Sequence, residues 1–89
     1  MAYKLYDAKK LQNGLEQLTG AEFAVAEREA RERGEQAMDI VISRTFHAVL
    51  AAKALKVPVE DIIELPIREY TVITGDVGSF LLAPEPNKV

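Results

Sequence analysis

Three side chains of the kinds used by hydrolytic enzymes stand four residues apart near the middle of this chain: Asp39, Ser43 and His47. On one helix, this spacing places them along a single face. Nucleophilic catalysis needs the base within hydrogen-bond reach of the hydroxyl, with the acid on the far nitrogen of the imidazole. Here the serine lies between the acid and the base, and no loop suited to an oxyanion hole is apparent. We therefore interpret these residues as a polar seam on an amphipathic helix rather than a catalytic triad.

Metal-binding and phosphate-binding patterns are equally weak. His47 with Asp39 and Glu35 offers too few ligands for zinc, and the chain has no cysteine. Gly75-Asp76-Val77-Gly78 has the letters of the GxxG loop of KH domains, but it lies in the most acidic third of the chain. We interpret Gly75, Gly78 and Ser79 as a place where another helix comes close. The sequence predicts no catalytic residue, metal, cofactor or small-molecule substrate.

The charge distribution argues against nucleic acid as a partner. The net charge is −3, and residues 57–89 contain two basic and six acidic side chains. An acidic surface repels phosphate. No apolar run approaches the roughly 20 residues needed to cross a bilayer, and the N-terminus leads into no signal peptide. We expect a soluble cytoplasmic protein that binds neither nucleic acid nor a membrane.

Residues 1–18 form an N-terminal segment that allows two interpretations. Asn13-Gly14 is a tight-turn signal after weak alternation, which favours a short β-hairpin with Leu15 and Leu18 on the return strand. Alternatively, Asp7 caps a short helix that Gly14 ends. Of the two, we prefer the hairpin.

Helix signals dominate from Thr19 onwards. Thr19-Gly20-Ala21-Glu22 is a capping box, and its helix reaches about Gly34. Apolar spacing predicts a central helix from about Gln36 to Lys56. A helical turn follows at Glu60–Ile63, and Leu65-Pro66 opens the last helix. The fold class is mainly α: a small bundle of three to four helices over residues 19–83, preceded in the preferred interpretation by the hairpin, with a flexible tail at 84–89.

The last helix combines an apolar stripe with two glycines, which makes it our candidate partner-binding face. The candidate residues are Tyr70, Val77, Phe80, Leu81 and Leu82. The alternative is that all of them are core residues against the central helix. Substitution separates the two interpretations, since truncating a core Phe80 to alanine costs about 3–5 kcal/mol.

The order of the segments resembles a known family. Leu18-Thr19-Gly20-Ala21-Glu22 opens a charged helix, Ala51-Ala52-Lys53-Ala54 closes a central one, and Val57-Pro58-Val59-Glu60-Asp61-Ile62 makes a turn. Leu65-Pro66-Ile67-Arg68-Glu69-Tyr70 then leads to Val77-Gly78-Ser79-Phe80-Leu81-Leu82. Over about Leu15 to Leu82, the chain is similar to the small tail assembly chaperones of long-tailed bacteriophages and prophages, including the Mu-like group.

This resemblance implies a non-enzymatic role. Such a chaperone binds the tape measure protein and keeps it soluble until tail tube subunits polymerise around it. The implied partners are the tape measure protein, tail tube subunits and further copies of the chain. The implied location is the host bacterial cytoplasm, not the mature virion. The alternatives are a structural tail or head-completion protein retained in the virion, and a small helical DNA-binding regulator. We also expect the chain to self-associate, with the apolar surface around the central helix as the interface.

Overall fold

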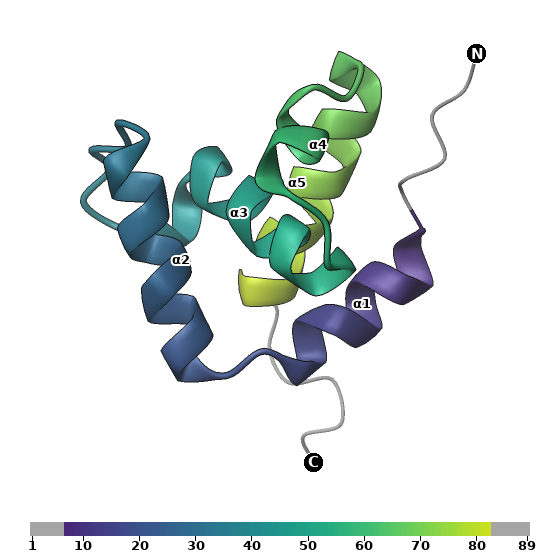
Figure 1. Ribbon diagram of the computed structural model, residues 1–89, viewed down its shortest axis with the longest axis horizontal. Coiled ribbons are helices and arrows are strands. Elements are labelled where there is room, and N and C mark those ends of the chain that lie inside the picture. The colour runs from purple at the N-terminus through teal and green to yellow at the C-terminus, as the bar shows by residue number, and fades with distance from the viewer. Residues whose placement is uncertain (1–6, 83–89) are drawn as a thin grey trace.

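A computed structural model describes residues 7–82 of the chain. Within that range the protein is helical and contains no strand (Figure 1). Its elements are α1 (Ala8–Gln17), α2 (Gly20–Glu32), the 3-10 helix η1 (Ile40–Ile42), α3 (Arg44–Leu55), α4 (Val59–Ile63) and α5 (Ile67–Leu82). The mainly α fold is confirmed, whereas the predicted tail at 84–89 and the first six residues lie outside the described range. None of the described helices has the length and apolarity needed to span a membrane.

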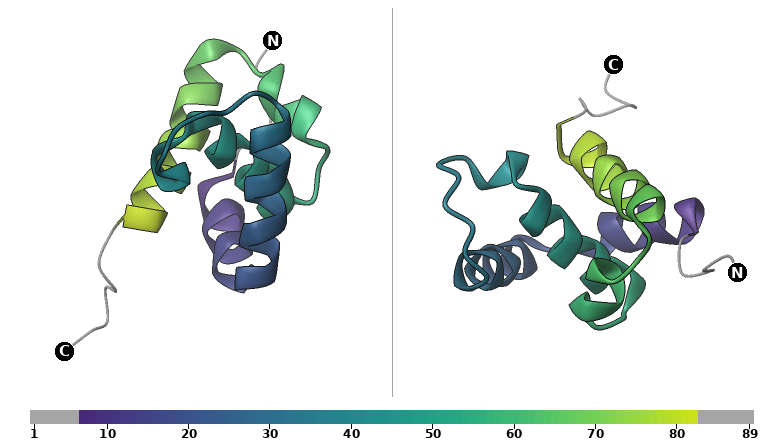
Figure 2. Two further views of the ribbon diagram at one scale, coloured as in Figure 1. Left: turned by 90° about the vertical axis from the view of Figure 1, so that its left-hand side faces the viewer. Right: turned by 90° about the horizontal axis from the view of Figure 1, so that it is seen from above.

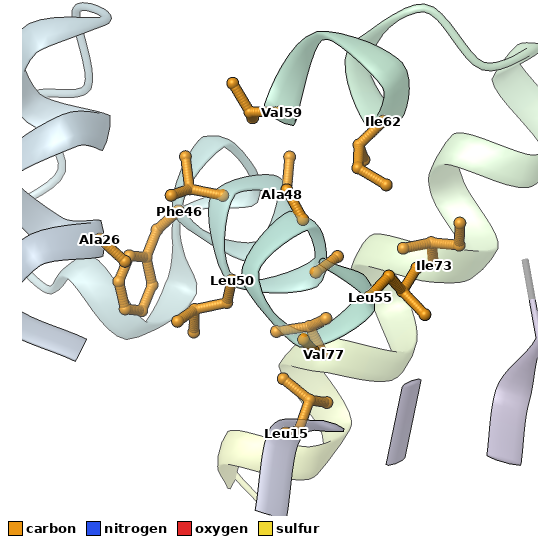
Figure 3. Packing of buried hydrophobic residues seen from close by; sticks show 14 of the residues in the cluster. Leu15, Ala26, Phe46, Ala48, Leu50, Leu55, Val59, Ile62, Ile73 and Val77 are labelled. Atoms are coloured by element: carbon orange, nitrogen blue, oxygen red, sulfur yellow. The ribbon is translucent and has the colours of Figure 1, made fainter. Parts of the chain in front are cut away.

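Helix α3 lies at the centre, and every other described helix packs on it. Seen from above, it runs between α2 and α5 (Figure 2). Nine of its 12 residues are buried, and labelled side chains from α1, α2, α4 and α5 surround it in Figure 3. The predicted central position is therefore confirmed. The prediction that two copies of the chain associate through the apolar surface of this helix is wrong, because the chain's own helices already cover that surface.

The central helix is shorter than predicted, because residues 36–43 are not part of it. Asp39 caps η1 by accepting from the amide of Val41, and Ser43 caps α3 by accepting from the amide of Phe46. Ser43 also donates to a carboxylate oxygen of Glu35 at 2.6 Å. Side-chain caps of this kind compete with helix continuation, so the chain bends at Ser43 instead of continuing a helix from Gln36.

The preferred N-terminal hairpin is wrong over the described residues. Asp7 accepts from the amides of Lys9 and Lys10 and caps α1, as the alternative interpretation had it. However, the helix continues past Gly14 to Gln17. Gly14 is a packing residue rather than a turn residue. A Cβ atom there would lie 2.8 Å from the carbonyl carbon of Ala54 and closer still to its oxygen. The missing side chain lets α1 pack directly on α3.

The local signals around α2 agree with the structure. The capping box of Thr19 and Glu22 is present, and Gly34 adopts a left-handed φ of 104° after the helix ends. Arg33 pairs with Glu29 on α2 and also with Glu60 of α4, at 3.2 Å in each case. The second pair links the end of α2 to α4. Ion pairs that are this exposed each add only about 0–1 kcal/mol to the free energy of unfolding.

The glycines of α1 and α5 provide a matched test of this packing. We expect Gly14→Ala to destabilise the fold by about 1–3 kcal/mol, because the new methyl group meets backbone atoms that cannot rotate away. Gly75→Ala is the control, because its Cβ would meet no atom within 4 Å. There the gain in helix propensity stabilises by about 0.5–1 kcal/mol. Urea unfolding of both variants measures the difference, and equal effects would refute the close approach of α1 and α3.

Candidate functional site

A groove of about 530 Å³ lies between the start of α3 and the C-terminal half of α5. It is lined by Ile42, Arg44, His47, Thr74, Gly75, Gly78, Ser79 and Leu82. Ile42 and Leu82 are each 63% exposed, so their apolar side chains are accessible to another molecule. An open groove with apolar residues and a few polar groups is suited to binding another molecule.

Small residues form the α5 wall of the groove. Gly75, Gly78, Ser79 and Leu82 recur at the three- and four-residue spacing of one helical face. A Cβ atom at Gly78 would lie 3.1 Å from Cε1 of His47, so this glycine is where α5 approaches α3. The predicted close approach is confirmed at Gly78. It is wrong at Gly75, whose missing side chain leaves open space instead.

The α3 wall is positioned by the bend at Ser43. Because the chain turns there, Ile42 lies before the helix and Arg44 begins it. The Nη1 of Arg44 donates to the hydroxyl of Thr74 at 2.8 Å, and that hydroxyl donates in turn to the carbonyl of Tyr70 at 2.7 Å. The buried Thr74 thus ties the first residue of α3 to α5 and holds the two walls together.

The Asp39, Ser43 and His47 constellation does not form a triad. Asp39 and Ser43 are helix caps, and Nε2 of His47 donates to the carbonyl of Val41. The residues therefore do not share one helix, and the interpretation as a polar seam is wrong. Within residues 7–82, no three potential acidic, histidine or cysteine ligands gather as they would around a metal ion.

Two titratable groups next to the bend have shifted pKa values. The hydrogen bond from Ser43, together with the amide of Ala37, lowers the pKa of Glu35. Burial lowers the pKa of His47, and the nearby positive charge of Arg44 lowers it further against the opposing effect of the Val41 carbonyl. At neutral pH the groove therefore contains an uncharged imidazole beside a charged guanidinium.

The five predicted partner-binding residues do not form one surface. Leu82 lines the groove, and Val77 is fully buried in the core. Tyr70, Phe80 and Leu81 are half-buried and pack against the core. Of the five predicted partner-binding residues, only Leu82 therefore belongs to the groove. Ile42 was missed because helical periodicity placed it on the buried stripe, although Asp39 and Ser43 are the cap residues that mark the bend.

The buried imidazole makes stability depend on pH. Because the pKa of His47 is lowered in the folded state, the unfolded chain binds more protons below the ordinary histidine value of about 6.5. We expect the free energy of unfolding to decrease from pH 7 to pH 5, a window above the carboxylate transition of Glu35. His47→Gln should remove this dependence, as measured by urea midpoints at both pH values. An unchanged pH dependence in that variant would contradict the assignment.

Comparison with protein-family models, with curated proteins and with solved structures finds no match to this chain.

Proposed function

We propose that this chain is a non-enzymatic tail assembly chaperone that binds the tape measure protein and keeps it soluble before the tail tube polymerises. The order of the segments from Leu15 to Leu82 supports this proposal by its resemblance to that family. The structural observation that supports it most is the exposed groove between α3 and α5. A helical client needs such a surface, because amphipathic helices bind by placing apolar side chains in grooves.

The two exposed rims of the groove fit a reversible contact. Ile42 and Leu82 project from different elements and together offer a limited apolar area. Burying an aliphatic side chain completely contributes about 1.5–3 kcal/mol. A contact of this size holds a client only when it is repeated along the length of the client. The client is released when tube subunits compete for the surface that the chaperone covers.

Replacing one rim residue tests the groove as the client site. We expect Leu82→Asp to leave the melting temperature within about 2 °C, because this exposed side chain contributes little to the core. Co-purification with the tape measure protein of the same phage or prophage should fall at least fivefold. Val25→Asp on α2, where valine is 43% exposed, is the matched control and should bind normally. Normal capture by Leu82→Asp would exclude the groove.

The protein content of purified virions distinguishes the proposed chaperone from its main alternative, a structural protein. A chaperone is absent from the finished tail, whereas a structural tail or head-completion protein remains in it. Mass spectrometry of purified virions that detects the chain at a fixed stoichiometry would favour the structural protein. Absence from virions, together with capture of the tape measure protein, is the expected result.

We also propose that the chaperone self-associates, through a surface other than α3. Three exposed aliphatic residues occur close together in the sequence, at the end of α4 and in the first half of α5: Ile63, Ile67 and Val72. A second hollow of about 400 Å³ is lined by Pro66, Ile67, Arg68, Glu69 and Val72. Because acidic and basic side chains flank the same apolar residues, two copies can pair them reciprocally across a two-fold axis.

Sedimentation velocity tests this second surface. Ile67 is 77% exposed, so Ile67→Asp places a charge in the interface without disturbing the core. We expect the wild-type chain to sediment as an oligomer at high micromolar concentration, and Ile67→Asp to sediment as a monomer. A wild-type monomer at all concentrations would contradict self-association.

A further inference from the structure

The groove contains one formal charge at neutral pH. Of its eight lining residues, only Arg44 is ionised, since burial keeps His47 neutral. The chain as a whole is acidic, with a net charge of −3. Arg44 therefore makes the groove a local positive site on an acidic protein, and a bound molecule with negative charge beside the apolar rims is favoured over one with positive charge.

Arg44 has no carboxylate partner among the described residues. Its one described hydrogen bond goes to the neutral hydroxyl of Thr74. By contrast, Arg31 of α2 and Arg33, which follows that helix, each pair with a glutamate four residues earlier. A guanidinium group has five N–H donors in a planar arrangement that matches a carboxylate. The exposed Arg44 thus retains donors for a second molecule, while its bond to Thr74 holds it at the groove.

The α5 wall of the groove has space for the backbone of another helix. Gly75 leaves open space where a side chain would stand, and the small side chain of Ser79 lies one turn further along, whereas Gly78 is already packed against His47. Small residues at helical spacing let the backbone of another helix approach closely, in the way that Gly14 lets α1 approach α3. Ile42 and Leu82 line the same groove from different elements, so an apolar side chain that enters the groove can contact both.

We propose that the groove binds a helix with an aliphatic residue seated between Ile42 and Leu82, and with an aspartate or glutamate one turn away that pairs with Arg44. Side chains three or four residues apart share one helical face, so a single helix presents both groups to the groove. That the helix belongs to the tape measure protein rests on the proposed function. The required chemistry, an acidic residue beside an aliphatic one, rests on the groove alone.

Designed peptides test this specificity without the tape measure protein. We use two sets of fluorescent helical peptides with leucine and glutamate three or four residues apart, and matched sets with lysine in place of glutamate. Anisotropy titration of the full chain should show binding of a glutamate peptide. Its lysine counterpart should bind up to about fivefold more weakly, which is the upper limit for an exposed ion pair. Equal affinities, or failure of every glutamate peptide to bind, would overturn the proposal.

Variants of the protein test whether Arg44 causes the discrimination between glutamate and lysine peptides. Arg44→Gln should reduce the discrimination between glutamate and lysine peptides to less than twofold. Because this variant also loses the hydrogen bond to Thr74, we expect a small decrease in its melting temperature, and the titrations are run well below that temperature. Arg28→Gln, which removes an exposed arginine from α2, is the control of equal charge change and should discriminate as the wild type does. Discrimination that survives Arg44→Gln would overturn the proposal.

The same variants distinguish failure of the specificity from failure of the function. If Arg44→Gln and the wild type capture the tape measure protein equally and no peptide is discriminated, the acidic specificity is refuted and the chaperone function stands. If the peptides are discriminated but the tape measure protein is not captured, the specificity stands and the proposed function fails. If Arg44→Gln dissociates the oligomer of the chain itself, a second copy occupies the groove, which overturns the proposal.

Discussion

The whole domain depends on how closely its helices approach α3. At two places a glycine makes that approach possible: Gly14 of α1 lies on the backbone of Ala54, and Gly78 of α5 lies against the ring of His47. The alanines of α3 serve the same purpose, since Ala48, Ala51, Ala52 and Ala54 are all buried. A chain of 89 residues buries a limited share of its surface, so its stability depends on dense contacts within the part that it does bury. The result is a core built around one central helix.

This core leaves the ends of the elements as the surface available for binding. Because α3 begins only at Arg44, after the bend that Ser43 and Glu35 hold, Ile42 lies outside the core instead of on its buried stripe. The same bend leaves Met38 99% exposed in the preceding loop. On the other wall, α5 ends with Leu82 beyond the reach of the core. A continuous helix from Gln36 would have taken Ile42 into the helical stripe and changed one wall of the groove.

Local signals in the sequence were sufficient to predict where most helices begin, but not to predict which residues of those helices contact one another. The capping box at Thr19, the cap at Asp7 and the start of α5 after Pro66 each depend on neighbouring residues, and the structure has all three. Gly14 could not be assigned in this way, because Asn-Gly is the same dipeptide whether it makes a turn or faces a distant carbonyl. At residues 36–43 the cap residues Asp39 and Ser43 were visible in the sequence, but the helical spacing of apolar residues outweighed them. The groove joins elements about 30 residues apart, so no local pattern could predict it.

Simple magnitudes indicate how a groove of this size would work in a chaperone. Ile42 and Leu82 are only partly available for burial, so together they contribute less than the roughly 3–6 kcal/mol of two fully buried aliphatic side chains. Association of two molecules costs an estimated 4–15 kcal/mol in lost translational and rotational freedom. An exposed pair between Arg44 and a carboxylate adds at most about 1 kcal/mol. If the proposed function holds, one groove holds a client weakly, and stable coating requires several copies that contact one another while each contacts the client. Under this balance, loss of contacts between copies releases the client without any change within the domain, which is the behaviour that an assembly factor requires.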